Sequence, residues 1–249
     1  MLTRCLPKGT REVIEVAVLS NQVYIFRFIA NEIEVVDFTG NTSERRLVNG
    51  LVEPSDLISY NRFWRLYITD CDQNLVYRVK IDGGTTRWEV NDVPDKLSGT
   101  SDGNVLVMCG IARKLKEFTT KDFKVRTIIL QEDLVHPRHA VMSRNKLFIS
   151  FGDGNKCGVC VVDFFGQVKK TYNTPTGIDE SQTNNYLYSP AFVVDKETNI
   201  IILDYNISRL LLLNETLSDV RELLLDEIVD ISELHPCGLC LDETRGRLL

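Results

Sequence analysis

The chain has 249 residues, of which 43% are hydrophobic, and a formal net charge of −6 at pH 7. This acidic balance gives no general attraction for nucleic-acid backbones, because their binding requires Lys and Arg to neutralise phosphates. The sequence has no signal-peptide-like start and no run of about 18 apolar residues that could cross a membrane. Seven cysteines, an odd number, then predict reduced thiols and a cytoplasmic location.

A short phrase, Pro-x-x-apolar, returns along the chain at intervals of 40, 43, 53 and 46 residues. Its prolines are Pro54, Pro94, Pro137, Pro190 and Pro236. Recurrence at such intervals indicates a repeated supersecondary unit. We expect one domain of successive units at about 11–52, 53–93, 94–135, 136–188 and 189–234, with a partial unit at 235–249, because one such unit cannot bury its faces alone.

Apolar runs bounded by Gly, Asp and Asn predict strands in each unit. In the first three units they lie at 13–18, 23–28, 33–37 and 45–48, then at 57–59, 66–70, 75–79 and 85–90, then at 105–109, 113–118 and 124–130. Later strands lie at 140–142, 147–151, 159–163 and 168–172, then at 192–195, 200–204, 209–213 and 220–225, with a loop at 226–234 and a last strand at 239–242.

Four antiparallel strands per unit, with nothing helical between them, are typical of the blade of a β-propeller. Proline fits the start of the first strand, since it has no N–H to give to a ladder. The chain ends at Leu249, only 13 residues after Pro236, which is too short for a full unit. We therefore predict an all-β, six-bladed propeller whose last blade is truncated, as part of a longer protein.

Cysteine and histidine are the first candidates for chemistry. Two Cys-x-x-Cys pairs, at 157–160 and 237–240, have the spacing of zinc ligands. However, 77 residues separate them, and the apolar neighbours of Cys160 and Cys240 favour buried structural thiols. The three histidines, His136, His139 and His235, adjoin the proline phrases without the spacing of a catalytic triad. We predict no catalytic residue, no metal and no cofactor.

Two alternative functions remain open. Carboxylates near a propeller axis could hold calcium in a hydrolase or lyase; the candidates are Asp56, Asp70, Asp163, Asp195, Asp204 and Asp242, although Asp at a strand end more often bonds the neighbouring turn. The segment 113–126 holds six Lys or Arg residues against Glu117 and Asp122. It could bind RNA, but a solvated outer strand is the favoured interpretation.

The order of proline phrase, strand ending in Asp, Asn-containing turn and further apolar strand resembles NHL-repeat propellers. The matching segments are 54–58, 66–70 and 74–78, and 192–195, 200–204 and 209–213. The resemblance is to the C-terminal propellers of invertebrate tripartite-motif ubiquitin ligases. The third unit departs from it, with Cys109-Gly110 where Asp is expected. The resemblance implies a recognition module without ligase activity of its own.

The resulting prediction is a non-enzymatic module that binds a protein partner through loops at one end of the blades, within a scaffold or ubiquitin-ligase-like protein. Because equivalent positions of a ring converge at the channel mouth, the predicted binding residues are taken from the proline phrases. They are Ser55, Asp56, Asp95, Lys96, Arg138, His139, Phe192 and Cys237.

Overall fold

The computed structural model describes residues 13–19, 22–27, 32–37, 43–60, 63–152, 156–174, 190–204, 209–223, 239, 241–242 and 247–248. The regular elements of these residues are β-strands. No helix in the described ranges has the length and apolar character needed to span a membrane. The chain contains two compact units, residues 1–97 with 237–249, and residues 98–236.

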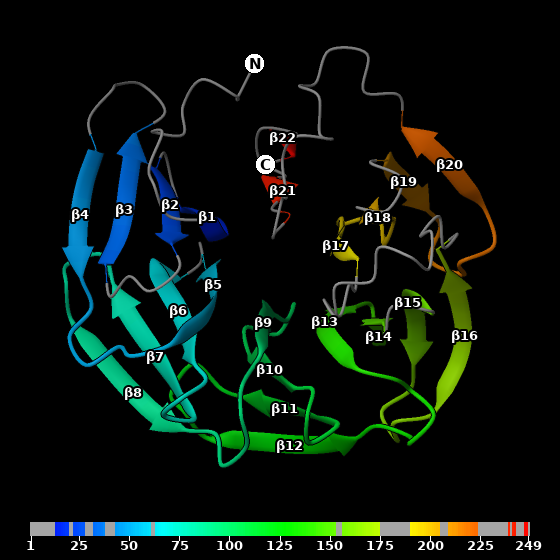
Figure 1. Cartoon of the computed structure of the whole chain (residues 1–249), viewed down its shortest axis with the longest axis horizontal. Helices are drawn as coiled ribbons and strands as arrows, with labels where there is room; N and C mark the ends of the chain where they lie inside the picture. The colour runs from blue at the N-terminus through cyan, green and yellow to red at the C-terminus, as the bar shows by residue number, and fades with distance from the viewer. Residues whose placement is uncertain are drawn as a thin grey trace, which may run out of the picture. The chain divides into compact units, whose positions relative to one another are not determined.

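The first unit contains two four-stranded antiparallel sheets whose strands follow one another in chain order (Figure 1). The first sheet consists of β1 (Val13–Leu19), β2 (Gln22–Arg27), β3 (Glu32–Asp37) and β4 (Ser43–Leu47). The second consists of β5 (Pro54–Tyr60), β6 (Arg65–Asp70), β7 (Leu75–Lys80) and β8 (Thr85–Glu89). The two first strands, β1 and β5, lie side by side. A two-stranded sheet, β21 (Leu241–Asp242) and β22 (Arg247–Leu248), belongs to the same unit.

The second unit repeats the arrangement in three sheets, and its boundary falls within β9. The third sheet consists of β9 (Lys96–Gly99), β10 (Val105–Cys109), β11 (Lys114–Phe118) and β12 (Lys124–Ile129). The fourth consists of β13 (Pro137–Ser143), β14 (Lys146–Gly152), β15 (Cys157–Val162) and β16 (Val168–Asn173). The fifth consists of β17 (Ala191–Val194), β18 (Ile200–Asp204), β19 (Arg209–Leu213) and β20 (Val220–Leu223).

The fourth sheet buries its two faces in different apolar cores, so it depends on both neighbouring sheets. Strand β14 illustrates this, because successive side chains of a strand point to opposite faces. Its Leu147 and Ile149 pack in a core shared with the third sheet, whereas Phe148 packs in a core with Phe192 and Ile202 of the fifth. In the first unit a separate core joins the first two sheets.

The predicted strand positions are confirmed to within two residues at almost every described end. Pro54 and Pro137 are the first residues of β5 and β13, where the missing N–H is tolerated. The differences lie at the proline phrases: β5 and β13 begin three residues earlier than predicted, and β9 has no strand among the predicted ranges. The predicted loop at 226–234 lies outside the described residues.

Candidate functional site

A β-bulge near the start of the first strand sets the position of the candidate site. The pairing register shifts between Val13 and Glu15 in β1, between Pro54 and Asp56 in β5, and between Pro137 and His139 in β13. Bulges bend a strand and re-aim its side chains. Glu15, Asp56 and His139 are therefore equivalent residues of their sheets.

Lys96 and Phe192 also follow a phrase proline by two residues, like Asp56 and His139. We call this set the bulge positions; its members are Glu15, Asp56, Lys96, His139 and Phe192.

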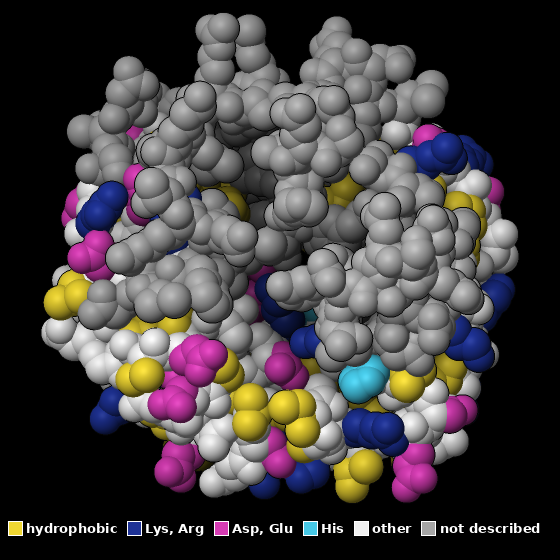
Figure 2. Space-filling model, in the orientation of Figure 1, with side chains coloured by type: hydrophobic (Ala, Val, Ile, Leu, Met, Phe, Trp, Pro, Cys, Tyr) yellow, Lys and Arg dark blue, Asp and Glu magenta, His cyan; other side chains and the backbone are white. Residues whose placement is uncertain are grey.

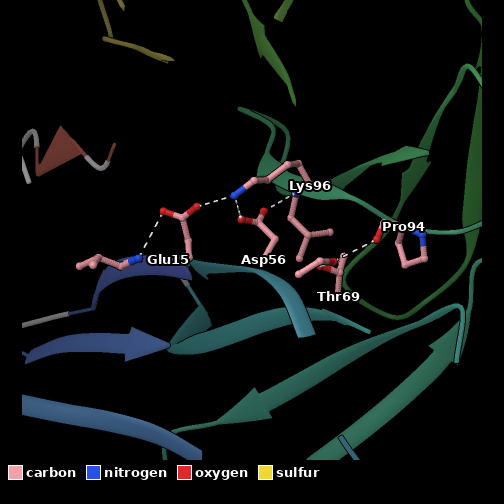
Figure 3. Close-up of polar contacts among 8 residues, drawn as sticks. Glu15, Asp56, Thr69, Pro94 and Lys96 are labelled. Atoms are coloured by element: carbon pink, nitrogen blue, oxygen red, sulfur yellow. Dashed lines mark hydrogen bonds and ion pairs between the residues drawn. The ribbon is translucent and has the colours of Figure 1, made fainter. Parts of the chain in front are cut away.

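In the first unit, three bulge positions form one ion cluster, the Lys96 triad, shown in Figure 3. The Lys96 ammonium lies 2.7 Å from Glu15 Oε2 and 2.8 Å from Asp56 Oδ1. These residues belong to the first strands of three consecutive sheets, β1, β5 and β9. Side-chain exposure is 11% for Glu15, 3% for Asp56 and 26% for Lys96, so the two carboxylates are largely removed from water and the lysine is partly exposed.

Backbone donors satisfy the remaining carboxylate oxygens of the triad. The Leu97 N–H donates to Asp56 Oδ2 over 2.6 Å, and the Val16 N–H donates to Glu15 Oε1 over 3.2 Å. Beside the triad, the Ser55 hydroxyl donates to the Pro94 carbonyl at 3.1 Å. The cluster therefore connects β5 to the phrase of the next sheet through both its charged and its neutral groups.

Burial and charge shift the proton affinities of the triad in a coupled way. Burial raises the pKa of Glu15 to about 8, although the nearby Lys96 opposes this; the Asp56 charge raises it further. Burial disfavours the charged form of Lys96, but the two carboxylates outweigh it and hold its pKa above the ordinary value. The lysine therefore stays an ammonium, and Glu15 is the group that titrates near neutrality.

In the second unit, the bulge positions meet through rings instead of charges. The His139 and Phe192 ring centroids are 5.1 Å apart, and they belong to the first strands β13 and β17, which lie side by side. Phe192 is 1% exposed and belongs to the apolar core. The same bulge position thus joins neighbouring first strands in both units.

The predicted binding residues occupy strands more often than loops, which corrects the sequence interpretation. Ser55 and Asp56 lie on β5, Lys96 on β9, Arg138 and His139 on β13, and Phe192 on β17; Asp95 lies just before β9.

Two of these residues are too buried to meet a partner, since Phe192 packs in the core and Asp56 is held by Lys96 and Leu97. The others described are partly exposed, and Cys237 lies outside the described residues. Whether the exposed members bind a partner stays a prediction.

The structure adds Glu15, which the sequence interpretation missed. The first sheet has no phrase proline to mark its bulge position. The available signal was a single carboxylate within the otherwise apolar strand VIEVAVL. A charge in such a strand is buried, and a buried charge requires a partner.

Three of the carboxylates proposed for calcium bond neighbouring turns, whereas Asp56 is held in the Lys96 triad. Asp70 accepts from the backbone N–H groups of Val52 at 2.8 Å and Gln73 at 3.2 Å. Asp163 and Asp195 each accept from two N–H groups of the following turn. These contacts are the strand-end role that the sequence favoured over calcium. The Asp204 and Asp242 side chains lie outside the described set.

The first Cys-x-x-Cys pair lies inside strand β15. Cys157 Sγ lies 2.8 Å from Thr174 Oγ1, and Cys160 Sγ lies 3.5 Å from the Ile149 carbonyl oxygen. Burial raises the pKa of Cys160 to about 12, away from the thiolate that zinc requires. The second pair lies outside the described residues.

The basic segment 113–126 does not form one uniform cationic face. Lys116 is 5% exposed. Arg126 Nε lies 2.6 Å from Glu117 Oε2, and its guanidinium lies over the Phe164 ring at 4.2 Å. Lys121 and Lys124 are exposed. Figure 2 shows Lys or Arg side chains interspersed with Asp or Glu over the described part of one face.

Comparisons with known proteins identify the fold but no family. No family model matches the chain, and no curated protein matches it. Among solved structures, it is similar to a streptogramin B lyase, with TM-score 0.69, 14% identity, and coverage of 97% of this chain and 76% of that one.

Two further solved structures are similar. Virginiamycin B lyase from Staphylococcus aureus has TM-score 0.68 and 16% identity, over 95% of this chain and 76% of that one. A chain of a nidogen/laminin complex has TM-score 0.61 and 14% identity, over 79% of this chain and 76% of that one. The fold is thus an all-β propeller with five complete blades, which matches a six-bladed template lacking one blade.

Proposed function

We propose that this chain is a non-enzymatic interaction module of the NHL-repeat kind, within a larger scaffold or ubiquitin-ligase-like cytoplasmic protein. It binds a protein partner through the loops and turns at the phrase end of its blades. The observation that supports this most directly is the Lys96 triad, whose ammonium lies within 2.8 Å of both carboxylates. The triad contains the ionisable groups whose pKa values are shifted furthest among the described residues. These groups hold strands together, which favours a binding role over a catalytic one.

Hydrogen bonds that fix the phrase end of the second sheet support the proposal. Pro54 pairs with Asp70, so the start of β5 and the β6–β7 turn lie together. Asp70 bonds both segments, through the Val52 N–H on one side and the Gln73 N–H on the other. Val52 is 58% exposed and Asp72 is exposed. A surface held in one conformation loses little entropy on binding, which favours affinity.

The third sheet presents an apolar side chain at the corresponding turn. Ile111 lies in the β10–β11 turn, closed by the hydrogen bond from Arg113 N to Gly110 O, and is 84% exposed. An exposed large apolar side chain on a fixed turn is a suitable anchor for a partner. This turn joins the second and third strands of its sheet, as the β6–β7 turn does in the second sheet.

The test uses exposed positions, so that the fold is retained. The purified chain, the Val52→Lys/Asp72→Lys variant and a Lys170→Glu control on β16 are each used to capture proteins from lysate. Captured proteins are identified by mass spectrometry, and the best is purified for calorimetry. We expect the double variant to weaken this complex at least about tenfold, as loss of about 1.4 kcal/mol would. Equal affinity for all three chains would refute this surface.

A further inference from the structure

The β5–β6 hairpin ends in an aromatic and cationic tip at the opposite end of the second sheet from the phrase. Tyr60 pairs with Arg65 at this end, and Arg65 also pairs with Lys80 of β7. We call Tyr60, Phe63, Trp64, Arg65 and Lys80 the hairpin tip. It is distinct from the surface proposed above, because Pro54 and Asp70 lie at the other end of the same two strands.

Aromatic rings form a supported platform at the hairpin tip. The rings of Tyr60 and Phe63 stack at 5.6 Å with an interplanar angle of 26°. Tyr60 also meets the fully buried Tyr67 edge to face at 6.3 Å, which anchors the platform in the sheet. Trp64 is 58% exposed although it is the largest side chain of the hairpin. Its backbone has φ of 54°, a region that bulky residues rarely adopt.

The charged residues on the strands around the platform are cationic, and Asp82 follows Lys80 in the β7–β8 turn. Arg65 and Lys80 stand directly opposite each other, and Arg78 stands opposite Tyr67 on the same face. Like charges directly opposite in a sheet are destabilising. Segments 57–69 and 75–81 contain no Asp or Glu. Within the described part of the chain, neither Arg65 nor Lys80 forms an ion pair.

One hairpin thus combines a strained exposed tryptophan with a like-charge pair. Each feature lowers the stability of the fold. Strained backbone and unfavourable charge pairs of this kind are found at functional sites. Trp and Arg are the residues enriched at the energetic centres of protein interfaces. An occupant that covers the exposed Trp64 side chain and separates the two cations must carry apolar surface for Trp64 and negative charge for Arg65 and Lys80.

We propose that the hairpin tip binds an acidic segment of a partner protein. An apolar side chain of that segment packs on Trp64 and Phe63, and flanking carboxylates lie between Arg65 and Lys80. A nucleic acid is disfavoured because two cations neutralise few phosphates and the chain carries a net charge of −6. This inference does not depend on the phrase-end surface, and the variants that test the two are different.

The test titrates the isotope-labelled chain with a synthetic peptide, acetyl-Asp-Glu-Leu-Phe-Asp-Glu-amide, and follows the two tryptophan indole signals by NMR. Trp64 and Trp88 are the two tryptophans of the chain. We expect the Trp64 signal to shift and the Trp88 signal, from a residue 8% exposed, to stay in place. Arg65→Glu/Lys80→Glu is expected to weaken binding at least about tenfold, and Lys170→Glu to leave it unchanged.

A second variant separates binding from folding. Trp64→Gly removes the anchor and relieves the positive φ, so it is expected to abolish binding while keeping or raising the urea midpoint. Three results would each overturn the proposal. They are equal binding of a peptide with Lys in place of Asp and Glu, tighter binding of an oligouridylate than of the acidic peptide, and a peptide-induced shift confined to residues outside the tip.

Discussion

Replacing Lys96 tests whether the triad stabilises the first unit. Lys96→Met keeps an unbranched side chain of similar length but removes the ammonium that lies 2.7 Å from Glu15 and 2.8 Å from Asp56. Breaking a buried ion pair from one side costs about 3 to 5 kcal/mol, because the remaining charge is left without a partner. Here two carboxylates remain, so we expect a loss in this range at pH 8.5.

The loss should be smaller at pH 6. Burial raises the pKa of Glu15 to about 8 even with the lysine present, so in the variant Glu15 can take up a proton and remove one of the two charges. Urea unfolding followed by far-UV circular dichroism at both pH values measures the two losses. Lys170→Met, at an exposed position of β16, is the control and should change stability by less than about 0.5 kcal/mol. A loss below about 1 kcal/mol at pH 8.5, or the same loss at both pH values, would contradict this account.

Three further substitutions test the same structure. The raised pKa of Glu15 means that the folded chain binds the carboxyl proton more tightly than the unfolded chain does. The free energy of unfolding, relative to that of Glu15→Gln, should therefore fall by a few kcal/mol as pH rises from 4.5 to about 8, as urea midpoints across that range would measure. A difference between the two chains that stays constant with pH would argue against this. Gly166→Ala should cost about 2 to 4 kcal/mol in thermal unfolding, since its φ is 82° and the new Cβ would lie 1.8 Å from the Ile129 carbonyl oxygen; an unchanged midpoint would show that the turn can move. Asp70→Asn should lower the free energy of unfolding by about 1.5 to 3 kcal/mol and speed hydrogen exchange at the Val52 amide, because that amide donates to the Asp70 carboxylate. Slow exchange at Val52 in the variant would mean that other contacts hold the loop.

The strands could be predicted because the dominant signal is local. Apolar runs of four to seven residues with turns between them are enough to place β10 at 105–109 and β19 at 209–213, with no knowledge of the neighbouring sheets. The recurring proline added the order of the sheets, since it marks the start of a first strand.

The contacts of the candidate residues could not be predicted from local patterns. Asp56 and Lys96 are 40 residues apart, and Glu15 is a further 41 residues away from Asp56, so nothing in the local pattern shows that the three meet. The sequence assigned Asp56 to a binding surface because equivalent positions of the phrases were expected to converge at the channel mouth. Once the bulge is known, the equivalence of Glu15 and Asp56 follows from the register alone. The positive φ of Trp64 has no sequence signal at all, since glycine or asparagine is expected there.

The bulge positions explain how the fold can be kept while the sequence changes. In the first unit the contact between neighbouring first strands is ionic, and in the second it is a ring contact between His139 and Phe192. The register shifts at this position in β1, β5 and β13 but not at Phe192 in β17, so contacts of different chemistry form at equivalent positions of similar sheets. A fold shared with the lyases at 14 to 16% identity therefore carries little information on function. Function must be sought where the chain accepts an energetic cost, and the hairpin tip, with a strained tryptophan beside two facing cations, is such a place.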